Sequence, residues 1–287
     1  MSEGDGTLAR CGSVWETPPA HVRLDEGDVH VWLVWLEQLT WHIPNLERIL
    51  SADERLRVER FAFRQDRDRF IVGRGLLRVL IGRYLRRTPQ ELCFDYGQYG
   101  KPTVVVEDGS VDLRFNVSHS QGVVLYAVAC HREVGVDVER VRAEFAVEPI
   151  AERYFSTREV EALQALPVAV REEAFFTCWT RKEAYVKATG KGFSLPLDQF
   201  EVSLVPGGPA VLLRTDWDPQ EVSRWALQAL SPGQGYVAAL AVEGHGWQLQ
   251  CWQLLTVEIA EKKKEKGKSV QSAGISTLQA SSEQQAE

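Results

Sequence analysis

The sequence predicts an α+β protein built from two pseudo-symmetric halves, each with helices packed on a small antiparallel sheet. The main observation is an order of elements that occurs twice: a strand, a helix that begins with a capping box, a long helix, and antiparallel strands. A fainter observation is that Gln121-Gly-Val-Val and Gln234-Gly-Tyr-Val each open an apolar strand. The repeated order therefore favours an α+β duplication.

The first half is expected over residues 28–133, after a polar segment, residues 1–27, that is predicted to be poorly ordered. The apolar run at 29–36 predicts a strand, and Ser51-Ala-Asp-Glu54 fits a capping box that begins a helix. The other elements expected in this half are a helix over 66–87, stopped by Pro89, and strands near 104–106, 113–117 and 122–130.

The second half is expected over residues 134–257 and repeats this order. A strand at 135–141 is followed by a second capping box, Ser156-Thr-Arg-Glu159, which begins a helix to about residue 166. A long helix over 170–189 follows and ends at Gly190. The further strands expected here lie at 199–205, 210–214, 224–231, 235–243 and 247–257. Residues 258–287 show no apolar period and are rich in Lys, Ser, Gln and Ala, so they are predicted to form a disordered tail.

Composition and length indicate a globular protein with a packed core. The chain has 287 residues, of which 44% are hydrophobic and 25% charged. The sequence shows neither a long apolar run nor the n-region and h-region of a secretory signal, so a cytoplasmic protein without a membrane partner is expected. The five cysteines are scattered and form no CxxC pair, which argues against a disulfide framework or a zinc site.

The net charge of −7 conceals a basic segment. Residues 55–87 contain eleven arginines against three acidic residues, a net charge of +8. Arg67, Arg74 and Arg78 lie on one stripe of the expected helix, which predicts either an anion-binding surface for phosphates or a solvated helix face. Nucleic acid is not an expected partner, because the rest of the protein is acidic and shows no recognition motif.

Three carboxylates and a lysine form the strongest candidate site. In the strand Gly135-Val-Asp-Val-Glu139, Asp137 and Glu139 point to the same face, with Cα atoms about 6–7 Å apart. Glu183 and Lys187 lie one turn apart on the long helix. Together these carboxylates suit Mg²⁺, and the lysine can reach phosphates that the metal binds. The alternatives are the solvent face of an edge strand and an ordinary ion pair along a helix.

These segments resemble the signature of the 4'-phosphopantetheinyl transferases of the surfactin-synthetase activator type. That family shows a Gly-(Val/Ile)-Asp-(Val/Ile)-Glu strand and, about forty residues on, a Trp-x-x-Lys-Glu-Ala-x-x-Lys helix, which here is Trp179 to Lys187. Gly100-Lys101-Pro102 and Phe115-Asn-Val-Ser-His119 match two weaker blocks. Each block alone is weak, but the ordered set, which spans roughly residues 50–205, is specific. The Trp/Lys-Glu-Ala form and the length favour the broad-range, monomeric subgroup.

The resemblance implies a fold, a reaction and partners. The fold would place the site in a cleft between two α+β halves. The reaction would transfer the 4'-phosphopantetheine group of the substrate coenzyme A to a serine of apo acyl, peptidyl or polyketide carrier proteins and release adenosine 3',5'-bisphosphate. The cofactor would be Mg²⁺, with Mn²⁺ as a substitute. Such holo-[acyl-carrier-protein] synthase type enzymes serve fatty acid, polyketide and nonribosomal peptide biosynthesis.

The resemblance also implies roles for particular residues. Asp137, Glu139 and Glu183 would bind the metal, and Asp137, Glu183 and Lys187 would be catalytic, with Glu183 either a metal ligand or the acceptor of the serine proton. The residues that would contact coenzyme A are Arg74, Arg78, Lys101, Pro102, Ser118, His119, Asp137, Glu183 and Lys187.

Two other classes of function remain open from the sequence. A Mg²⁺-dependent phosphodiesterase or nuclease also uses clustered carboxylates, and a cleavage assay against coenzyme A binding would separate it from a transferase. A catalytically silent module that binds carrier proteins would show degenerate metal residues, whereas Asp137, Glu139, Glu183 and Lys187 are all intact. A P-loop is excluded because the sequence contains no GxxxxGK[ST] motif.

Overall fold

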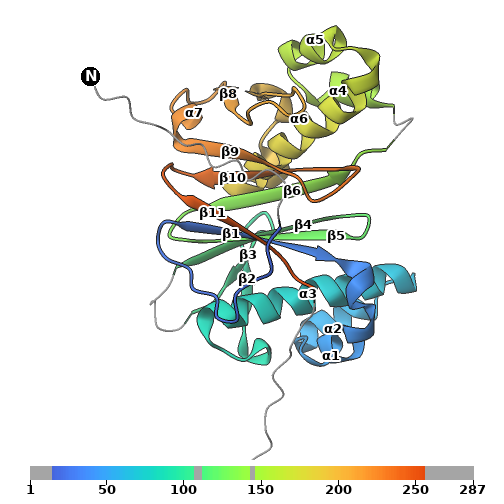
Figure 1. Ribbon diagram of the computed structural model, residues 1–287, viewed down its shortest axis with the longest axis vertical. Helices are drawn as coiled ribbons and strands as arrows, with labels where there is room; N and C mark the ends of the chain where they lie inside the picture. Colours follow the sequence, from blue (N-terminus) through green and yellow to red (C-terminus); the bar gives the residue numbers. More distant parts are fainter. Residues whose placement is uncertain (1–14, 107–111, 143–145, 256–287) are drawn as a thin grey trace, which may run out of the picture.

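The computed structural model describes residues 15–106, 112–142 and 146–255, and it shows two sheets stacked face to face with helices on both outer sides (Figure 1). The first sheet has the strand order β11-β1-β5-β4, and the second has the order β6-β10-β9. The strands are β1 (Asp28–Trp35), β4 (Leu113–Ser120), β5 (Val123–Cys130), β6 (Val134–Arg140), β9 (Trp225–Leu230), β10 (Tyr236–Glu243) and β11 (Gln248–Gln253). The predicted α+β class is confirmed.

An apolar core lies between the two sheets. It is built from alternate residues of both, such as Val31 and Leu125 from the first sheet and Val136 and Leu240 from the second. Strand β5 is buried at every position, because it has the second sheet on one face and helix α3 (Arg64–Leu85) on the other. This shared core makes the two halves one packed unit.

Each sheet carries one long helix on its outer face (Figure 1). Helix α3 covers the first sheet and α6 (Val168–Thr189) covers the second, and both are 22 residues long. Shorter helices pack around them: α1 (Ile43–Arg48), α2 (Ala52–Val58), α4 (Val147–Tyr154), α5 (Thr157–Ala165) and α7 (Glu221–Arg224). Two small hairpin sheets complete the fold: β2 (Phe94–Tyr96) with β3 (Pro102–Val104), and β7 (Phe200–Val202) with β8 (Leu212–Thr215).

Helix termini follow the sequence signals closely. Both predicted capping boxes are present, at the N-caps Ser51 of α2 and Ser156 of α5. Helix α6 ends at Thr189, and Gly190 takes the left-handed conformation with φ of 68°. Helix α3 ends two residues earlier than expected, because Arg86 already turns left-handed, with φ of 52°, before Pro89 is reached.

Several short elements were absent from the sequence prediction, among them the helical turns of Leu36–Arg48, strand β2 and the helices α4 and α7. Each is too short for its apolar period to stand out from a loop. The last strand also differs from the expected arrangement. Strand β11 follows β10 in the chain, yet it pairs in parallel with β1, with Trp252 opposite Trp32, and so joins the first sheet.

Part of the predicted N-terminal segment is held against this last strand. The Trp15 side chain donates to the carbonyl of Ser231 at 2.7 Å, and the Glu16 amide donates to the carbonyl of Cys251 at 3.1 Å. Residues 1–14 and the predicted disordered tail, 258–287, lie outside the described residues. Within the described chain, no helix is both long and apolar enough to cross a membrane.

Candidate active site

The site begins where α6 lies directly on β6, and Gly135 makes this close approach possible. A Cβ atom at Gly135 would lie 2.1 Å from the carbonyl oxygen of Ala184 and 2.3 Å from the amide nitrogen of Ala188. Only a residue without a side chain fits there. The first residue of the Gly-Val-Asp-Val-Glu motif therefore sets how closely the helix residues Glu183 and Lys187 approach the strand carboxylates.

Lys187 and Asp137 form the central contact of the site. The Nζ atom of Lys187 lies 2.6 Å from Oδ1 of Asp137 and 3.0 Å from Oγ of Ser118, and the Ser118 hydroxyl in turn donates to Asp137 Oδ1 at 2.8 Å. Asp137 is 3% exposed. The structure thus brings together three predicted residues from β4, β6 and α6, one from each element.

Side chains of β4 join the edges of the two sheets. Asn116 Oδ1 accepts from the Val136 amide at 3.0 Å, Ser118 Oγ from the Val138 amide at 3.3 Å, and Ser120 Oγ from the Arg140 amide at 3.2 Å. Ser120 also donates to Glu139 Oε2 at 2.8 Å. Sequence reasoning missed this row, although the alternation of polar side chains at 116, 118 and 120 was a visible signal for one strand face.

The three predicted metal ligands lie close enough together to act on one another's charge. Burial, and then the nearby charge of Asp137, raises the pKa of Glu183, with a smaller effect of Glu139. Burial also raises the pKa of Glu139, and Asp137 adds to that effect. Oδ2 of Asp137 is buried and faces no hydrogen-bond donor among the described residues.

This arrangement fits a small, hard cation. A divalent ion would offset the repulsion between carboxylates that raise one another's pKa values. It would also supply a partner for the buried oxygen that has no hydrogen-bond donor. Among the described residues, no three His, Cys, Asp or Glu side chains are already gathered around one point.

A basic group lies beside these carboxylates. Partial burial lowers the pKa of His119, and the positive charges of Lys187 and Arg69 lower it further. The histidine was predicted to be a phosphate contact, whereas Arg69 was missed because it lies off the predicted arginine stripe. His119 therefore lies within electrostatic reach of both Lys187 and Arg69.

A cavity of about 640 Å³ opens from this centre toward the hairpin of β2 and β3. Glu183, Lys187 and Trp179 of α6 form one wall, and Lys101 and Pro102 form another. The remaining lining residues are Tyr99, Gly100, Asn116, Val117, Arg153, Tyr154, Val186, Gly190, Gly192, Leu195, Pro196, Leu197 and Asp198. Both halves of the chain therefore contribute to its surface.

A second hollow of about 750 Å³ lies beyond the opposite end of β4. Arg69 and Val72 of α3 and the turn Gln121–Gly122, which directly follows Ser120, are part of its lining. Asn116 borders the first cavity, Ser118 meets Asp137, and the turn after Ser120 borders the second hollow. The carboxylate centre therefore stands between two open regions along one strand.

The lysine of the Lys-Glu-Ala motif has a structural role. Lys182 is fully buried, and its Nζ atom lies 2.7 Å from Oε2 of Glu159, 2.7 Å from the carbonyl of Leu197 and 2.6 Å from the carbonyl of Phe200. These contacts fix the rotation of α6 about its axis. The neighbouring residue, Glu183, is thereby turned toward the cavity.

The structure does not bring Arg74 and Arg78 to the cavity. Both guanidinium groups bind the buried carboxylate of Glu54, with Arg78 Nε 2.6 Å from Oε2. Arg78 also donates to two backbone carbonyls and is 2% exposed, so its donors are used inside the protein. Arg74 lies over the ring of Phe94, 4.2 Å from its centroid. The expected coenzyme A contact is therefore not available to Arg78.

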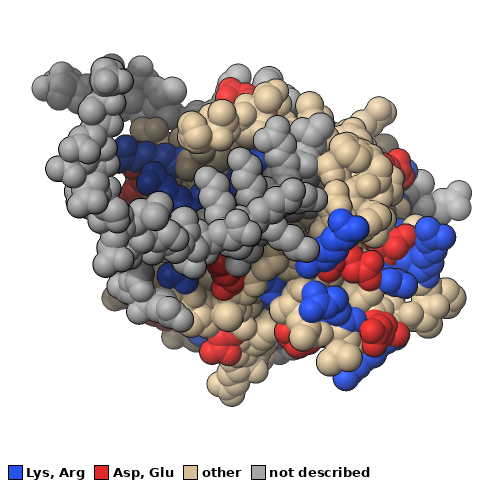
Figure 2. Space-filling model, turned by 90° about the horizontal axis from the view of Figure 1, so that it is seen from below, with Lys and Arg blue, Asp and Glu red and all other residues tan. Residues whose placement is uncertain are grey.

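Three further arginines of this segment are also paired with carboxylates. Figure 2 views the molecule from the side of α1, α2 and α3 and shows lysine and arginine side chains interleaved with aspartate and glutamate. The pairs along α3 are Arg64–Asp68 at 3.6 Å, Arg67–Glu47 at 2.7 Å and Arg69–Asp66 at 3.5 Å. Positive and negative side chains alternate on this surface. Its positive electrostatic potential is therefore weaker than the net charge of residues 55–87 suggests.

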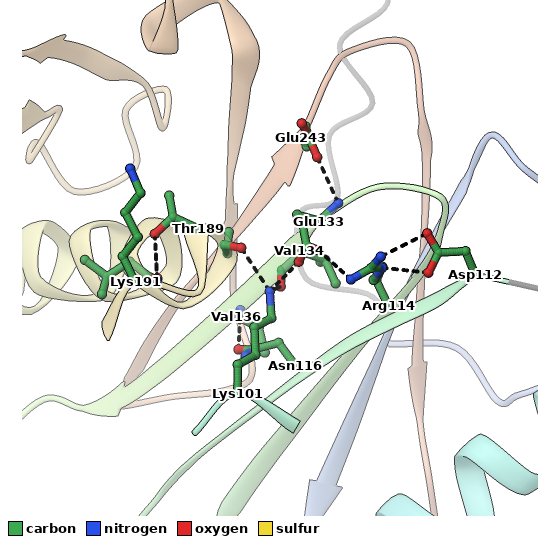
Figure 3. A network of polar contacts seen from close by, with 12 residues as sticks. Lys101, Asp112, Arg114, Asn116, Glu133, Val134, Val136, Thr189, Lys191 and Glu243 are labelled. Carbon is green, nitrogen blue, oxygen red and sulfur yellow. Dashed lines mark hydrogen bonds and ion pairs between the residues drawn. The ribbon is translucent and has the colours of Figure 1, made fainter. Parts of the chain in front are cut away.

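Lys101 lies at the junction of the two halves (Figure 3). Its Nζ atom lies 2.6 Å from Oε2 of Glu133, 3.2 Å from the carbonyl of Val134 and 2.9 Å from the carbonyl of Ala188. Burial lowers the pKa of Lys101, and Glu133 opposes that effect. Pro102 follows it as the first residue of β3. Lys101 lines the cavity, and its ammonium is held by these three acceptors.

Comparison with known proteins agrees with these features. A family profile described as "4'-phosphopantetheinyl transferase superfamily" matches residues 133–241, and one described as "4'-phosphopantetheinyl transferase, N-terminal" matches residues 38–131. The chain is 40% identical over 238 residues to the 4'-phosphopantetheinyl transferase HetI of Nostoc sp. strain PCC 7120, which covers 83% of this chain and 97% of the relative.

A second relative is more distant. The chain is 33% identical over 159 residues to the 4'-phosphopantetheinyl transferase Sfp of Bacillus subtilis strain 168, which covers 55% of this chain and 68% of the relative. Among solved structures, the holo-[acyl-carrier-protein] synthase of Thermotoga maritima aligns with 39% of this chain and 62% of its own, at 23% identity and a TM-score of 0.31.

Proposed function

Because the chain belongs to the 4'-phosphopantetheinyl transferase superfamily and is a transferase that acts on carrier proteins, we propose that its reaction takes place in the cleft between the two halves. The observation that carries the proposal is the contact of Lys187 with Asp137 at 2.6 Å, beside Glu183 and on the wall of a 640 Å³ cavity. The carboxylates that would bind a metal and the lysine that would bind a phosphate thus lie side by side.

The cavity between α6 and the turn before β3 is the proposed site for coenzyme A. Its walls are partly apolar, with Trp179, Val186 and Pro102 among the lining residues, and its inner end carries Lys187. The positive charges of Lys187, at this end, and of Arg69, on the wall of the second hollow, both lower the pKa of His119. The pyrophosphate of coenzyme A would therefore lie between these basic groups and the carboxylates.

Asp137, Glu139 and Glu183 would hold the magnesium ion. When bound, such an ion neutralises negative charge on the pyrophosphate and on the leaving 3',5'-bisphosphate. Lys187 neutralises the same charge from the helix side, and the Ser118 hydroxyl keeps the Asp137 carboxylate in orientation. Glu183 accepts the proton of the incoming serine hydroxyl, directly or through water, so that the oxygen can attack the β-phosphorus of coenzyme A.

The acceptor must reach the reaction centre from a side that coenzyme A leaves free. We place the carrier protein at the second hollow, because its turn Gln121–Gly122 directly follows Ser120, which holds Glu139. Apo acyl, peptidyl and polyketide carrier proteins all present a serine, so the chemistry of the centre does not choose among them. Mn²⁺ would replace Mg²⁺ at oxygen ligands of this kind.

The proposal is tested by incubating the protein with coenzyme A, Mg²⁺ and purified apo carrier proteins of each class, followed by intact mass measurement. At least one carrier is expected to gain the mass of one phosphopantetheine group, and chelation of the metal should abolish the gain. A carrier whose target serine is replaced by alanine is the control. Coenzyme A binding without modification of any carrier class would contradict the proposed transfer.

A further inference from the structure

Two loops from opposite halves meet at the end of the coenzyme A cavity. The turn Tyr99–Pro102 belongs to the first half, and the loop Gly190–Gly192 follows α6 in the second; we call the pair the clasp. A Cβ atom on Gly190 would lie 3.5 Å from Cδ of Lys101, and one on Gly192 would lie 3.3 Å from Cβ of Tyr99. The turn therefore packs closely on both glycines.

Both glycines also have backbone conformations that favour the absence of a side chain. Their φ angles are 68° for Gly190 and 53° for Gly192, in the left-handed region. The Gly-Lys-Gly sequence after α6 thus does two things at once: it ends the helix, and it leaves room for the opposing turn. Both loops line the cavity.

The ammonium of Lys101 pins the clasp. A lysine ammonium has three N–H donors. Here they are accounted for by Glu133 Oε2 at 2.6 Å, the carbonyl of Val134 at 3.2 Å and the carbonyl of Ala188 at 2.9 Å. Ala188 lies in the last turn of α6, where backbone carbonyls have no partner within the helix and where a positive charge is favoured.

Glu133 is itself held in place from two further strands (Figure 3). Its Oε1 atom accepts from Arg114 Nη1 of β4 at 2.9 Å, and its backbone amide donates to Oε2 of Glu243 in β10 at 3.3 Å. Arg114 is paired in turn with Asp112, at 2.8 Å. The carboxylate that receives Lys101 is therefore fixed before coenzyme A arrives.

We propose that Lys101 is a positioning residue: its ammonium ties the turn Tyr99–Pro102 to Glu133 and to the end of α6, and so fixes the wall of the coenzyme A cavity, while the ammonium itself makes no contact with the coenzyme. This inference rests on the proposed function for the identity of the ligand. It assigns a different role to a lysine that the sequence suggested as a direct contact.

The two roles make opposite predictions for Glu133→Gln. If Lys101 positions the turn, removal of the Glu133 charge loosens the clasp and weakens coenzyme A binding, as Lys101→Met does. If Lys101 binds the coenzyme directly, removal of Glu133 frees the ammonium for phosphate, and binding is unchanged or tighter. The double variant distinguishes the two roles a second time. If Lys101 and Glu133 act in one network, the effects of their substitutions on coenzyme A binding are not additive.

The experiment measures coenzyme A affinity by calorimetry and, in parallel, kcat and KM for coenzyme A. The variants are Lys101→Met, Glu133→Gln and their combination, with Asp112→Asn as the matched control, because it removes a partner of Arg114 and leaves the contacts of Lys101 in place. Each single variant is expected to raise the coenzyme A Kd about tenfold, since a hydrogen bond to a charged group is lost. The double variant should bind about as weakly as the weaker single one, and kcat at saturation should stay within about twofold in all of them.

Gly192→Ala provides an independent arm that leaves the ion pair intact. The added methyl group would press on Tyr99 from the second half, so coenzyme A Kd should rise and kcat should hold. Gly192→Ala therefore still tests the contact between the two loops of the clasp if Lys101→Met does not fold.

Several results would overturn the inference. Lys101→Met with weaker binding but Glu133→Gln with unchanged or tighter binding would establish a direct contact. A lower melting temperature with an unchanged Kd in every variant would reduce Lys101 to a stabilising residue. If the wild-type protein bound no coenzyme A, the proposed function itself would be contradicted. If the wild type binds but the variants do not show the expected changes in Kd, only the positioning role is contradicted.

Discussion

Asp137 serves two partners with one carboxylate. Its Oδ1 atom accepts from Lys187 and Ser118, and its buried Oδ2 atom faces no donor in the described chain. Such a group is unfavourable unless a cation completes it, so its position is better explained by a bound charge than by stability. Neutral replacements of Asp137 should then affect the reaction much more than the fold.

Asp137→Asn is expected to slow transfer at least about 100-fold, equivalent to roughly 3 kcal/mol of barrier. The change removes the charge that binds the metal and keeps the size of the side chain. The rate at saturating Mg²⁺ is the measurement, with Glu152→Ala on the exposed side of α4 as the control. A rate within a few-fold of wild type would remove Asp137 from the metal site.

Glu183→Gln should separate binding from catalysis. The amide keeps the packing of α6 but accepts no proton, so kcat is expected to collapse by about 100-fold or more while coenzyme A still binds. Calorimetry and single-turnover rates check this on the same protein. A variant that turns over at the wild-type rate would leave Glu183 as a helix-surface partner of Lys187 only.

His30 makes the stability of the protein depend on pH. Burial lowers its pKa from 6.5 to about 4, because Asp28, at 3.9 Å, only partly compensates. Between those pH values the unfolded chain binds a proton that the folded protein does not bind. Stability is therefore full above pH 6.5 and is lost as the pH falls toward 4, by about 3 kcal/mol from this group. Urea unfolding at pH 7 and pH 4.5 measures it, and His30→Gln should lose less stability over that interval than wild type.

At the scale of elements, the contact of α6 with β6 determines the site. The close approach at Gly135 places one helix turn, Ala184 to Ala188, on the strand that carries Asp137 and Glu139. The buried Lys182–Glu159 pair sets the rotation of the same helix. One contact fixes the distance between the elements, and the other fixes which helix side chains face the cleft.

Gly135→Ala is expected to destabilise the protein by about 1–3 kcal/mol, because the new methyl group overlaps backbone atoms of α6 and the helix must shift. The loss of activity should exceed the loss that reduced stability alone would cause, since the shift moves Glu183 and Lys187 together. The matched control is Gly73→Ala in α3, where nothing lies within 4 Å of the added Cβ and a small gain in stability is expected. Equal melting temperatures for both variants would contradict the close approach as the cause.

The sequence predicted elements well and contacts poorly, for physical reasons. Apolar periods and capping boxes located the long helices α3 and α6 and most strands, because these signals are local. The sequence could place Asp137 and Glu139 on one face because a strand points alternate residues to the same side. The pairing of Arg78 with Glu54 and the partners of Lys101 were missed, because they join residues 24 to 87 positions apart.

At the scale of the whole molecule, the two halves share more than a cleft. One apolar core lies between their sheets, the side chains of β4 hold the edge of β6, and β11 returns from the second half to the first sheet. Separation of the halves would expose that core and leave the amides of β6 without acceptors. We therefore expect them to fold and unfold together, although each resembles a small domain.

Thermal unfolding should accordingly show a single transition, with equal calorimetric and van't Hoff enthalpies. Coenzyme A with Mg²⁺ should raise the midpoint without splitting it, because the ligand binds residues of both halves. Differential scanning calorimetry tests both statements. Two resolved transitions would mean that the shared core is too weak to couple the halves.

The return of β11 to β1 has a consequence for synthesis on the ribosome. A chain that emerges from its N-terminus completes β1, β5 and β4 long before residues 248–253 have been made. Until then, one side of β1 exposes unpaired amides and carbonyls, which is the kind of edge that recruits other extended chains. The nascent first half thus stays incomplete until residues 248–253 have been made, and it is prone to aggregation in that interval.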